Sequence, residues 1–137
     1  MSYLLDTNIL SETRKRNGDP RVKEWISATS RERMHISVLT IGELGHGITQ
    51  LRERGDRRQA AVIEGWLDEV VDEFGKRIVP VTLDVAREWG MQSSARPAPT
   101  VDALIAATAM VHGWTVVTRN VKDFEATGVR LLNPFTD

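Results

Sequence analysis

Short apolar runs alternate with longer amphipathic segments along the chain. The apolar runs predict β-strands at Tyr3–Leu5, Met34–Ser37, Arg77–Val79, Thr115–Thr118 and Val129–Leu132. The segments with helical periodicity predict helices at Asn8–Arg16, Pro20–Ala28, Val38–Arg52, Arg57–Phe74, Leu83–Ser93 and Val101–His112. This alternation is typical of an α/β domain in which helices flank a mostly parallel central sheet.

Two of the predicted helices carry long apolar stripes. The first stripe consists of Ile41, Leu44, Ile48 and Leu51, and the second of Ala60, Ile63, Leu67, Val70 and Phe74. The charged segment 52–58 separates them, so we expect a helical hairpin. Two interpretations of the stripes remain open. Either both stripes simply pack on the domain core, or part of their surface is left for a partner or a second copy.

The length and charge of the chain limit its class. The 137 residues fit one domain, 1–137, with a single core. The net charge of −1 gives no general basic field, so contact with a nucleic acid requires a local patch. The absence of cysteine excludes disulfides and zinc–thiolate sites. The histidines, His35, His46 and His112, lack the spacing of metal ligands, which argues against zinc.

No segment predicts export or membrane insertion. Asp6 interrupts the apolar start at Met1–Leu5 before a signal-like core can form. The longest apolar stretch, Ala103–Val111, is interrupted by Thr108 and is shorter than the roughly 20 residues of a membrane span. We therefore expect a soluble, cytoplasmic protein.

Four acidic residues lie beside short apolar segments: Asp6, Glu43, Asp102 and Asp123. Each has a simple structural explanation. Asp6 can cap the helix that follows, and Asp102 gains about 0.3–1 kcal/mol from the dipole of a helix that Thr100 is expected to cap. Glu43 can be a solvated helix residue, and Asp123 a turn-former.

The positions of the four acids relative to the predicted sheet favour a joint role. A parallel sheet brings the carboxyl ends of its strands, and the helix starts that follow them, to one edge, where ligands bind. Four unrelated structural acids would all have to fall at that edge by coincidence. A site made of carboxylate oxygens suits Mg²⁺, with Mn²⁺ as the other candidate.

Four segments together resemble the PIN-domain ribonucleases and, within them, the VapC-type toxins of toxin–antitoxin pairs. The segments are Leu5–Leu10 (LDTNIL), Ser37–Leu44 (SVLTIGEL), Asp102–Ala109 (DALIAATA) and Val117–Phe124 (VTRNVKDF). The resemblance implies a PIN-like three-layer fold. It also implies that Asp6, Glu43, Asp102 and Asp123 form the family's acidic quartet, with Asp6 and Asp102 as metal ligands and Asn8, Thr118 and Asn120 as the polar residues that orient them. Family members often have an acid where this chain has Asn120, so one or two metal ions remain possible.

The resemblance implies metal-dependent, endonucleolytic hydrolysis of RNA. A cation held by Asp6 and Asp102 would lower the pKa of a bound water, and Glu43 or Asp123 would position or deprotonate it. Arg14, Arg96, Arg119 and Lys122 lie near the acids in the sequence. Among these basic residues, we favour Arg119 and Lys122 as contacts for RNA phosphates. The resemblance further implies a cognate antitoxin and a homodimer.

Two other functions share part of this sequence pattern. A haloacid-dehalogenase-like phosphotransferase needs a second acid two residues after the first, where this chain has Asn8. A non-catalytic PIN-like module that binds RNA or protein is the main alternative, and a nuclease assay with and without Mg²⁺ separates it from an enzyme. The sequence leaves the RNA target open, because tRNA, rRNA and mRNA present the same phosphodiester.

Overall fold

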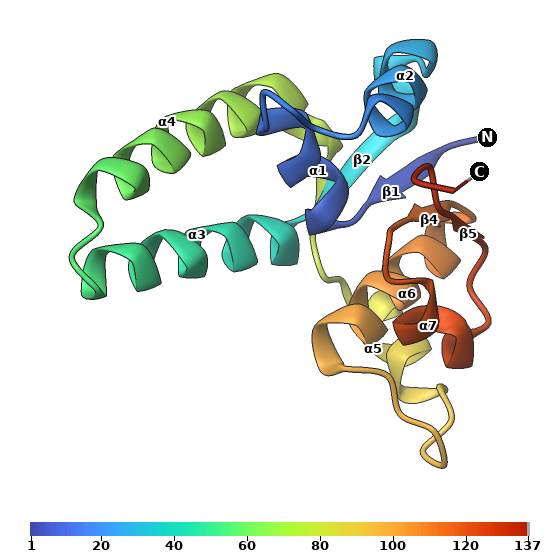
Figure 1. The fold of residues 1–137 in the computed structure, drawn as a ribbon. Coiled ribbons are helices and arrows are strands. Elements are labelled where there is room, and N and C mark those ends of the chain that lie inside the picture. Colours follow the sequence, from blue (N-terminus) through green and yellow to red (C-terminus); the bar gives the residue numbers. More distant parts are fainter. Residues whose placement is uncertain (137) are drawn as a thin grey trace.

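The computed structural model describes residues 1–136 and shows an α/β fold (Figure 1). Five strands form the central sheet: β1 (Tyr3–Leu5), β2 (Met34–Ser37), β3 (Ile78–Val79), β4 (Thr115–Val117) and β5 (Leu131–Leu132). Their order is β3-β2-β1-β4-β5, and every neighbouring pair is parallel. The sheet is therefore fully parallel, with β1 at its centre.

Seven α-helices surround the sheet: α1 (Thr7–Arg14), α2 (Pro20–Ala28), α3 (Val38–Glu53), α4 (Arg57–Phe74), α5 (Leu83–Gly90), α6 (Thr100–His112) and α7 (Val121–Phe124). Short 3₁₀ turns, η1 (Arg31–Arg33), η2 (Gly75–Arg77) and η3 (Glu125–Thr127), complete the described part of the chain. Within residues 1–136, no helix is long and apolar enough to cross a membrane.

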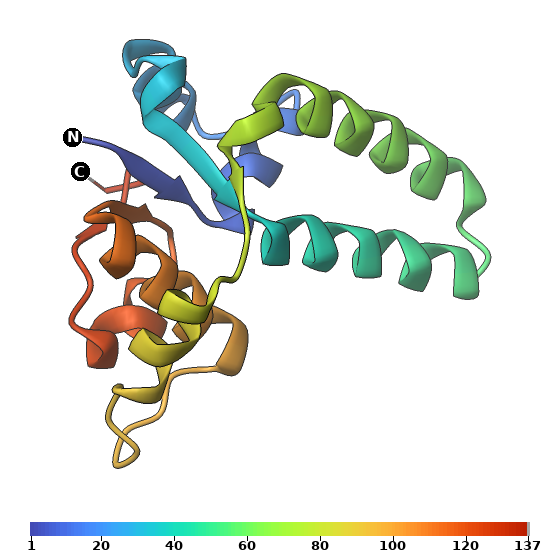
Figure 2. The same ribbon diagram turned by 180° about the vertical axis from the view of Figure 1, so that it is seen from behind.

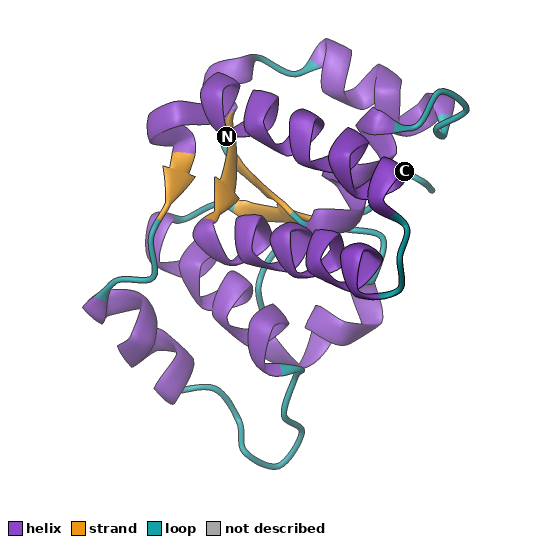
Figure 3. Cartoon of the chain, turned by 90° about the vertical axis from the view of Figure 1, so that its left-hand side faces the viewer, coloured by secondary structure: helices purple, strands orange, loops and turns teal. Residues whose placement is uncertain are grey.

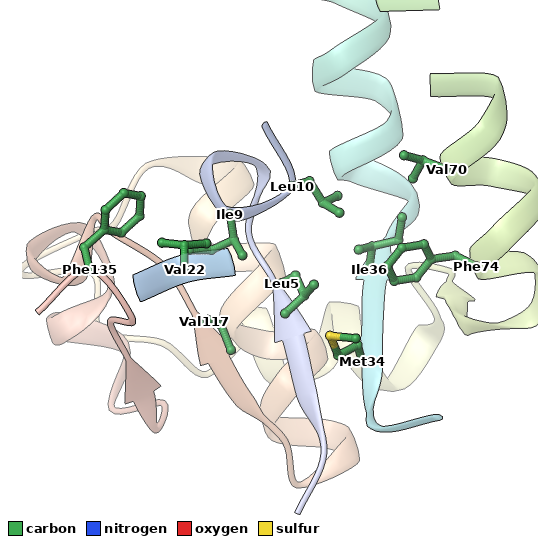
Figure 4. Packing of buried hydrophobic residues seen from close by; sticks show 10 residues of the cluster. All are labelled: Leu5, Ile9, Leu10, Val22, Met34, Ile36, Val70, Phe74, Val117 and Phe135. Atoms are coloured by element: carbon green, nitrogen blue, oxygen red, sulfur yellow. The ribbon is translucent and has the colours of Figure 1, made fainter. Parts of the chain in front are cut away.

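Alternation of side chains along the strands produces three layers. Leu5 and Val117 face a core built with α1, α2 and the end of α4 (Figure 4). The residues that precede them, Leu4 and Val116, face the other core, which α6 and α7 complete. Figure 2 shows the same layers from behind, with α5 packed on α6. The predicted three-layer arrangement is confirmed.

The α3–α4 hairpin extends beyond the sheet and has a small core of its own. Ile48, Ala60 and Leu67 are buried between the two helices, where most of the two apolar stripes meet. At the base of the hairpin, Val70 and Phe74 join the main core instead. Figure 3 looks from the side of the hairpin, with its helices in front of the strands. The predicted hairpin is confirmed, and the stripes pack mainly against each other.

Several predicted boundaries were wrong. α6 begins at Thr100, and Pro99 is its N-cap, because the Pro99 carbonyl already accepts a hydrogen bond from the Ala103 amide at 2.8 Å. Thr100 is thus a helical residue and not the cap. α1 ends at Arg14 and α5 at Gly90, so both helices are shorter than predicted, and β3, β4 and β5 are shorter as well. The short helix α7 was not predicted.

Candidate active site

Asp6 lies where the central strand ends and α1 begins. It is the N-cap of α1, and its Oδ1 accepts a hydrogen bond from the Thr7 amide at 2.9 Å. The carboxylate is buried, with only 5% of the residue exposed. Burial raises its pKa, and hydrogen bonds from Thr118, Thr7 and Asn8 oppose that rise. Asp6 therefore both caps a helix and faces the edge of the sheet where ligands bind.

Polar residues from α1 and from the segment after β4 hold the Asp6 carboxylate. The hydroxyl of Thr118 donates to Asp6 Oδ2 at 2.9 Å, and the Asn8 amide donates to the same oxygen at 3.2 Å. The backbone amide of Asn120 donates to the Thr118 hydroxyl at 3.0 Å, and the amide of Arg119 donates to Asn8 Oδ1 at 3.1 Å. A carboxylate has about four lone-pair sites. Three protein donors therefore fix the orientation of Asp6 and still leave room for a cation.

Asp102 is the acid on which the charges of the other three act. It stands in the first turn of α6, half-buried. Burial, followed by the negative charges of Asp6, Asp123 and Glu43, raises the pKa of Asp102 to about 6. A carboxylate in such surroundings is stabilised by a cation. The structure thus brings the other three predicted acids within electrostatic range of Asp102.

Glu43 reaches the site from the second turn of α3. Its side chain is exposed, and its Oε1 accepts a hydrogen bond from the Thr7 hydroxyl at 2.7 Å. This bond ties α3 to the start of α1, next to Asp6. Asp123 is exposed in α7 and lines a separate hollow of about 390 Å³ together with Arg119, Asn120 and Lys122. Asp123 and Lys122 therefore stand at the margin of the site.

A cavity of about 360 Å³ opens between the acids and the turn that follows α1. Its lining consists of Asp6, Thr7, Asn8, Ser11, Glu12, Lys15, Glu43, Asp102, Arg119, Asn120 and Phe135. Sequence reasoning missed Ser11, Glu12, Lys15 and Phe135, because no motif marks them and only the fold brings them here. Of the basic residues considered, Arg14 lies over Trp66 at 6.0 Å in a neighbouring hollow, and Arg96 is exposed before α6.

The donor set fits a hard divalent cation. Asp6 and Asp102 both line the cavity, and Mg²⁺ commonly binds through one or two carboxylates while keeping several waters. Within residues 1–136, no group of three or more His, Asp or Glu side chains forms a metal-binding cluster. Asp6 and Asp102, together with bound waters, would be enough to hold such a cation. Coordination of the cation by further acids would require side chains to move.

The histidines stand apart from this cavity. His35 and His112 stack on the ring of Trp114, with centroid distances of 3.9 and 4.2 Å. Trp114 precedes β4, whereas Thr118 follows it, so the stacked rings lie at the end of the sheet opposite the acids. His46 is exposed on α3.

Comparison with known proteins places the chain in a family. The sequence pattern of the PIN domain family matches residues 3–129. The VapC ribonuclease Y4jK of Sinorhizobium fredii is 34% identical to this chain over 96% of each protein, and toxin FitB of Neisseria gonorrhoeae is 30% identical over 98% of this chain and 99% of FitB. The crystal structure of FitAcB from Neisseria gonorrhoeae superposes with a TM-score of 0.87, at 30% identity, covering 97% of this chain and 98% of that one. The chain belongs to the PIN domain family and, within it, to the VapC toxins of toxin–antitoxin systems.

Proposed function

We propose that this protein is a metal-dependent endoribonuclease that hydrolyses RNA phosphodiester bonds and acts as the toxin of a toxin–antitoxin pair. The observation that carries the proposal is that Asp6, Glu43 and Asp102 line one cavity at the edge of the sheet, where burial and the charges of Asp6, Asp123 and Glu43 raise the pKa of Asp102. Four mutually repelling acids at one edge of a sheet are costly to the fold unless a cation balances them. The full-length relatives named VapC ribonuclease and tRNA(fMet)-specific endonuclease support the same activity.

Each residue has a distinct role in the proposed reaction. Asp6 and Asp102 would hold Mg²⁺, or Mn²⁺ in its place, which when bound activates a water and polarises the phosphodiester. Thr118, Asn8 and Asn120 keep the Asp6 carboxylate in its orientation. A carboxylate oxygen of Glu43 or Asp123 accepts the proton of the attacking water. Arg119 and Lys122 are proposed to contact RNA phosphates.

Substitution of the two proposed metal ligands tests the assignment. Asp6→Asn and Asp102→Asn should each lower Mg²⁺-dependent RNA cleavage by orders of magnitude, because each removes a charged ligand. Asn can still cap α1, so Asp6→Asn should stay folded. Asp84→Asn is a matched control, since Asp84 also lies in the first turn of a helix, α5, and outside the cavity. Cleavage by either variant at the wild-type rate would contradict the assigned site.

We further propose that the protein binds a cognate antitoxin and forms a homodimer. Solved relatives include a toxin–antitoxin complex from Klebsiella pneumoniae. An apolar hollow of about 180 Å³ beside Glu43, lined in part by Leu44, Ile63 and Trp66, supports contact with a protein segment next to the acids. Light scattering of the isolated chain at micromolar concentration tests the dimer. A monomer that also fails to bind the product of the adjacent gene would contradict both proposals.

The main alternative is a PIN-like module that binds RNA or protein without cutting it. A nuclease assay with Mg²⁺ and with a chelator distinguishes the two, since only the enzyme shows metal-dependent cleavage.

We propose that residues 1–137 act as one domain and that the protein acts in the cytoplasm, where RNA substrates are found. Which class of RNA is cut is a question for sequencing of the cleavage products.

A further inference from the structure

The cavity is lined by both acidic and basic side chains. Asp6, Glu12, Glu43 and Asp102 are its acids, and Lys15 and Arg119 are its cations. The two cations come from distant parts of the chain, Lys15 from just after α1 and Arg119 from just after β4. Folding therefore brings two positive charges into the lining of the same cavity as the predicted acids.

Glu12 holds the turn that carries Lys15. It is buried, its Oε1 accepts from the Asp19 amide at 2.7 Å, and its Oε2 faces the Lys15 ammonium at 3.3 Å. The bond from Asp19 is the main reason why the pKa of Glu12 lies below its usual range. The Lys23 ammonium donates to the Lys15 carbonyl at 2.9 Å. The backbone of residues 15–19 is thus braced from both sides.

The side chains of both cations remain accessible from the cavity. The side chain of Lys15 is 54% exposed, and its ammonium has three donors, of which one points to Glu12. The Arg119 amide is fixed by Asn8, and its guanidinium carbon lies 4.7 Å from the centre of the Phe135 ring. Phe135 is buried, so its ring is held in place and limits the movement of the guanidinium that packs on it.

We propose that Lys15 and Arg119 form a subsite for a backbone phosphate of the RNA next to the bond that is cut. The subsite rests on the proposed function. RNA carries one negative charge per nucleotide, which the acids of the cavity repel, so a strand can enter this cavity only if a cation offsets that repulsion. A guanidinium and an ammonium are the side chains that bind phosphate. Lys15, which no motif marks, is the new element of the site.

Binding of a short fluorescent single-stranded RNA to the metal-free protein tests the subsite without relying on cleavage. Lys15→Ala should weaken binding about fivefold at physiological salt, and the slope of log affinity against log salt should fall by about 0.7, the value for one lost contact to a single strand. In the double variant that also carries Arg119→Ala, the slope should fall by about twice that amount. Lys15→Arg should bind as the wild type does. Lys76→Ala, an equal charge change on an exposed residue of η2, should have no effect.

Cleavage kinetics add a second measurement. Lys15→Ala should raise KM and leave kcat within about twofold, because a uniform phosphate contact changes binding and not the chemical step. Unchanged RNA binding and KM in Lys15→Ala would overturn the subsite. The subsite would also be overturned if Lys15→Ala weakened binding to a partner protein but not to RNA. Failure of the wild type to cut any RNA would refute the proposed function instead, while loss of RNA binding in Lys15→Ala would still support the subsite.

Discussion

The hydroxyl of Thr118 donates a hydrogen bond of 2.9 Å to Oδ2 of Asp6, a residue 112 positions earlier in the chain. Thr118 is fully buried, and β4 lies beside β1, so the two side chains meet at the end of adjacent strands. Burial raises the pKa of Asp6, and the Thr118 hydrogen bond is the largest effect that lowers it. Thr118 thus helps to keep Asp6 in the charged form that the proposed cation site requires.

Removal of this hydroxyl should shift the pH dependence of the enzyme. In Thr118→Val the donor is lost, so the pKa of Asp6 should rise and the acidic limb of the rate profile should move to higher pH. Hydrogen bonds to charged groups contribute about 1.5–3 kcal/mol, so the acidic limb should move by roughly one to two pH units. Thr118→Ser keeps the hydroxyl and should behave as the wild type. An unchanged profile in Thr118→Val would show that this bond does not set the charge of Asp6.

Asp102 should make the metal-free protein less stable as the pH rises. Its pKa is raised to about 6 in the folded protein, against an ordinary value of 3.8. The folded state therefore binds the proton more tightly, so this contribution is fully present below about pH 4 and is lost as the pH passes 6. The change is at most about 3 kcal/mol at 1.36 kcal/mol per pKa unit, and solvent screening reduces it.

Melting curves in chelator check this expectation. Asp102→Asn should melt at nearly the same temperature as the wild type at pH 4.5 and several degrees higher at pH 7.5, because the variant carries no charge to be repelled. Asp84→Asn, the control in α5, should show no such pH-dependent difference. A gap between Asp102→Asn and the wild type that does not grow with pH would argue against repulsion among the four acids.

Magnesium should stabilise the wild type more than Asp102→Asn. A ligand at about 100 times its dissociation constant contributes roughly 2.7 kcal/mol, which corresponds to several degrees for a domain of this size. Loss of one carboxylate should shrink that shift. In the wild type the shift should also shrink below pH 6, where Asp102 takes up a proton. Thermal unfolding with and without millimolar Mg²⁺ measures both effects, and equal shifts in the two proteins would exclude Asp102 from the cation site.

Gly18 should not tolerate a side chain. A Cβ at this position would overlap the Glu12 carbonyl oxygen and lie 2.9 Å from Cε of Lys23. Gly18→Ala should therefore displace the turn that carries Lys15 and destabilise the protein by about 1–3 kcal/mol. Gly65→Ala is the matched control, since nothing lies within 4 Å of its Cβ in the middle of α4 and alanine favours a helix. Equal melting temperatures of Gly18→Ala and wild type would refute the expected clash.

The sequence pattern predicted the layers of the fold well because burial follows simple periodicities. Leu4 and Leu5 belong to opposite cores, as alternation along a strand requires. The short helix α7 escaped prediction because only Phe124 of its four residues is buried, and Asn120 and Asp123 are common in turns. The start of α6 was misjudged because Thr100 is a good cap by residue type, while the backbone of Pro99 does the capping.

The candidate site was only partly open to prediction. Acids at strand ends could be placed together because parallel topology brings those ends to one edge. Glu12 and Lys15 could not be placed at the site from the sequence, because their positions depend on hydrogen bonds within the turn before α2. The stack of His35 and His112 on Trp114 has no local signal either, since it forms only when β2 and β4 pair with the two sides of β1 and α6 ends beside them.

The central position of β1 has a consequence for the order of folding. Its partner β2 follows within about thirty residues, whereas its other partner, β4, is made more than a hundred residues later. Chains fold from the N-terminal side as they are synthesised, and contacts between distant segments form late. Asp6 therefore comes together with Asp102, Thr118 and Asp123 only after most of the chain has left the ribosome. Because the proposed site is incomplete until then, we expect a nascent chain bearing only the first strands not to cut the RNA around it.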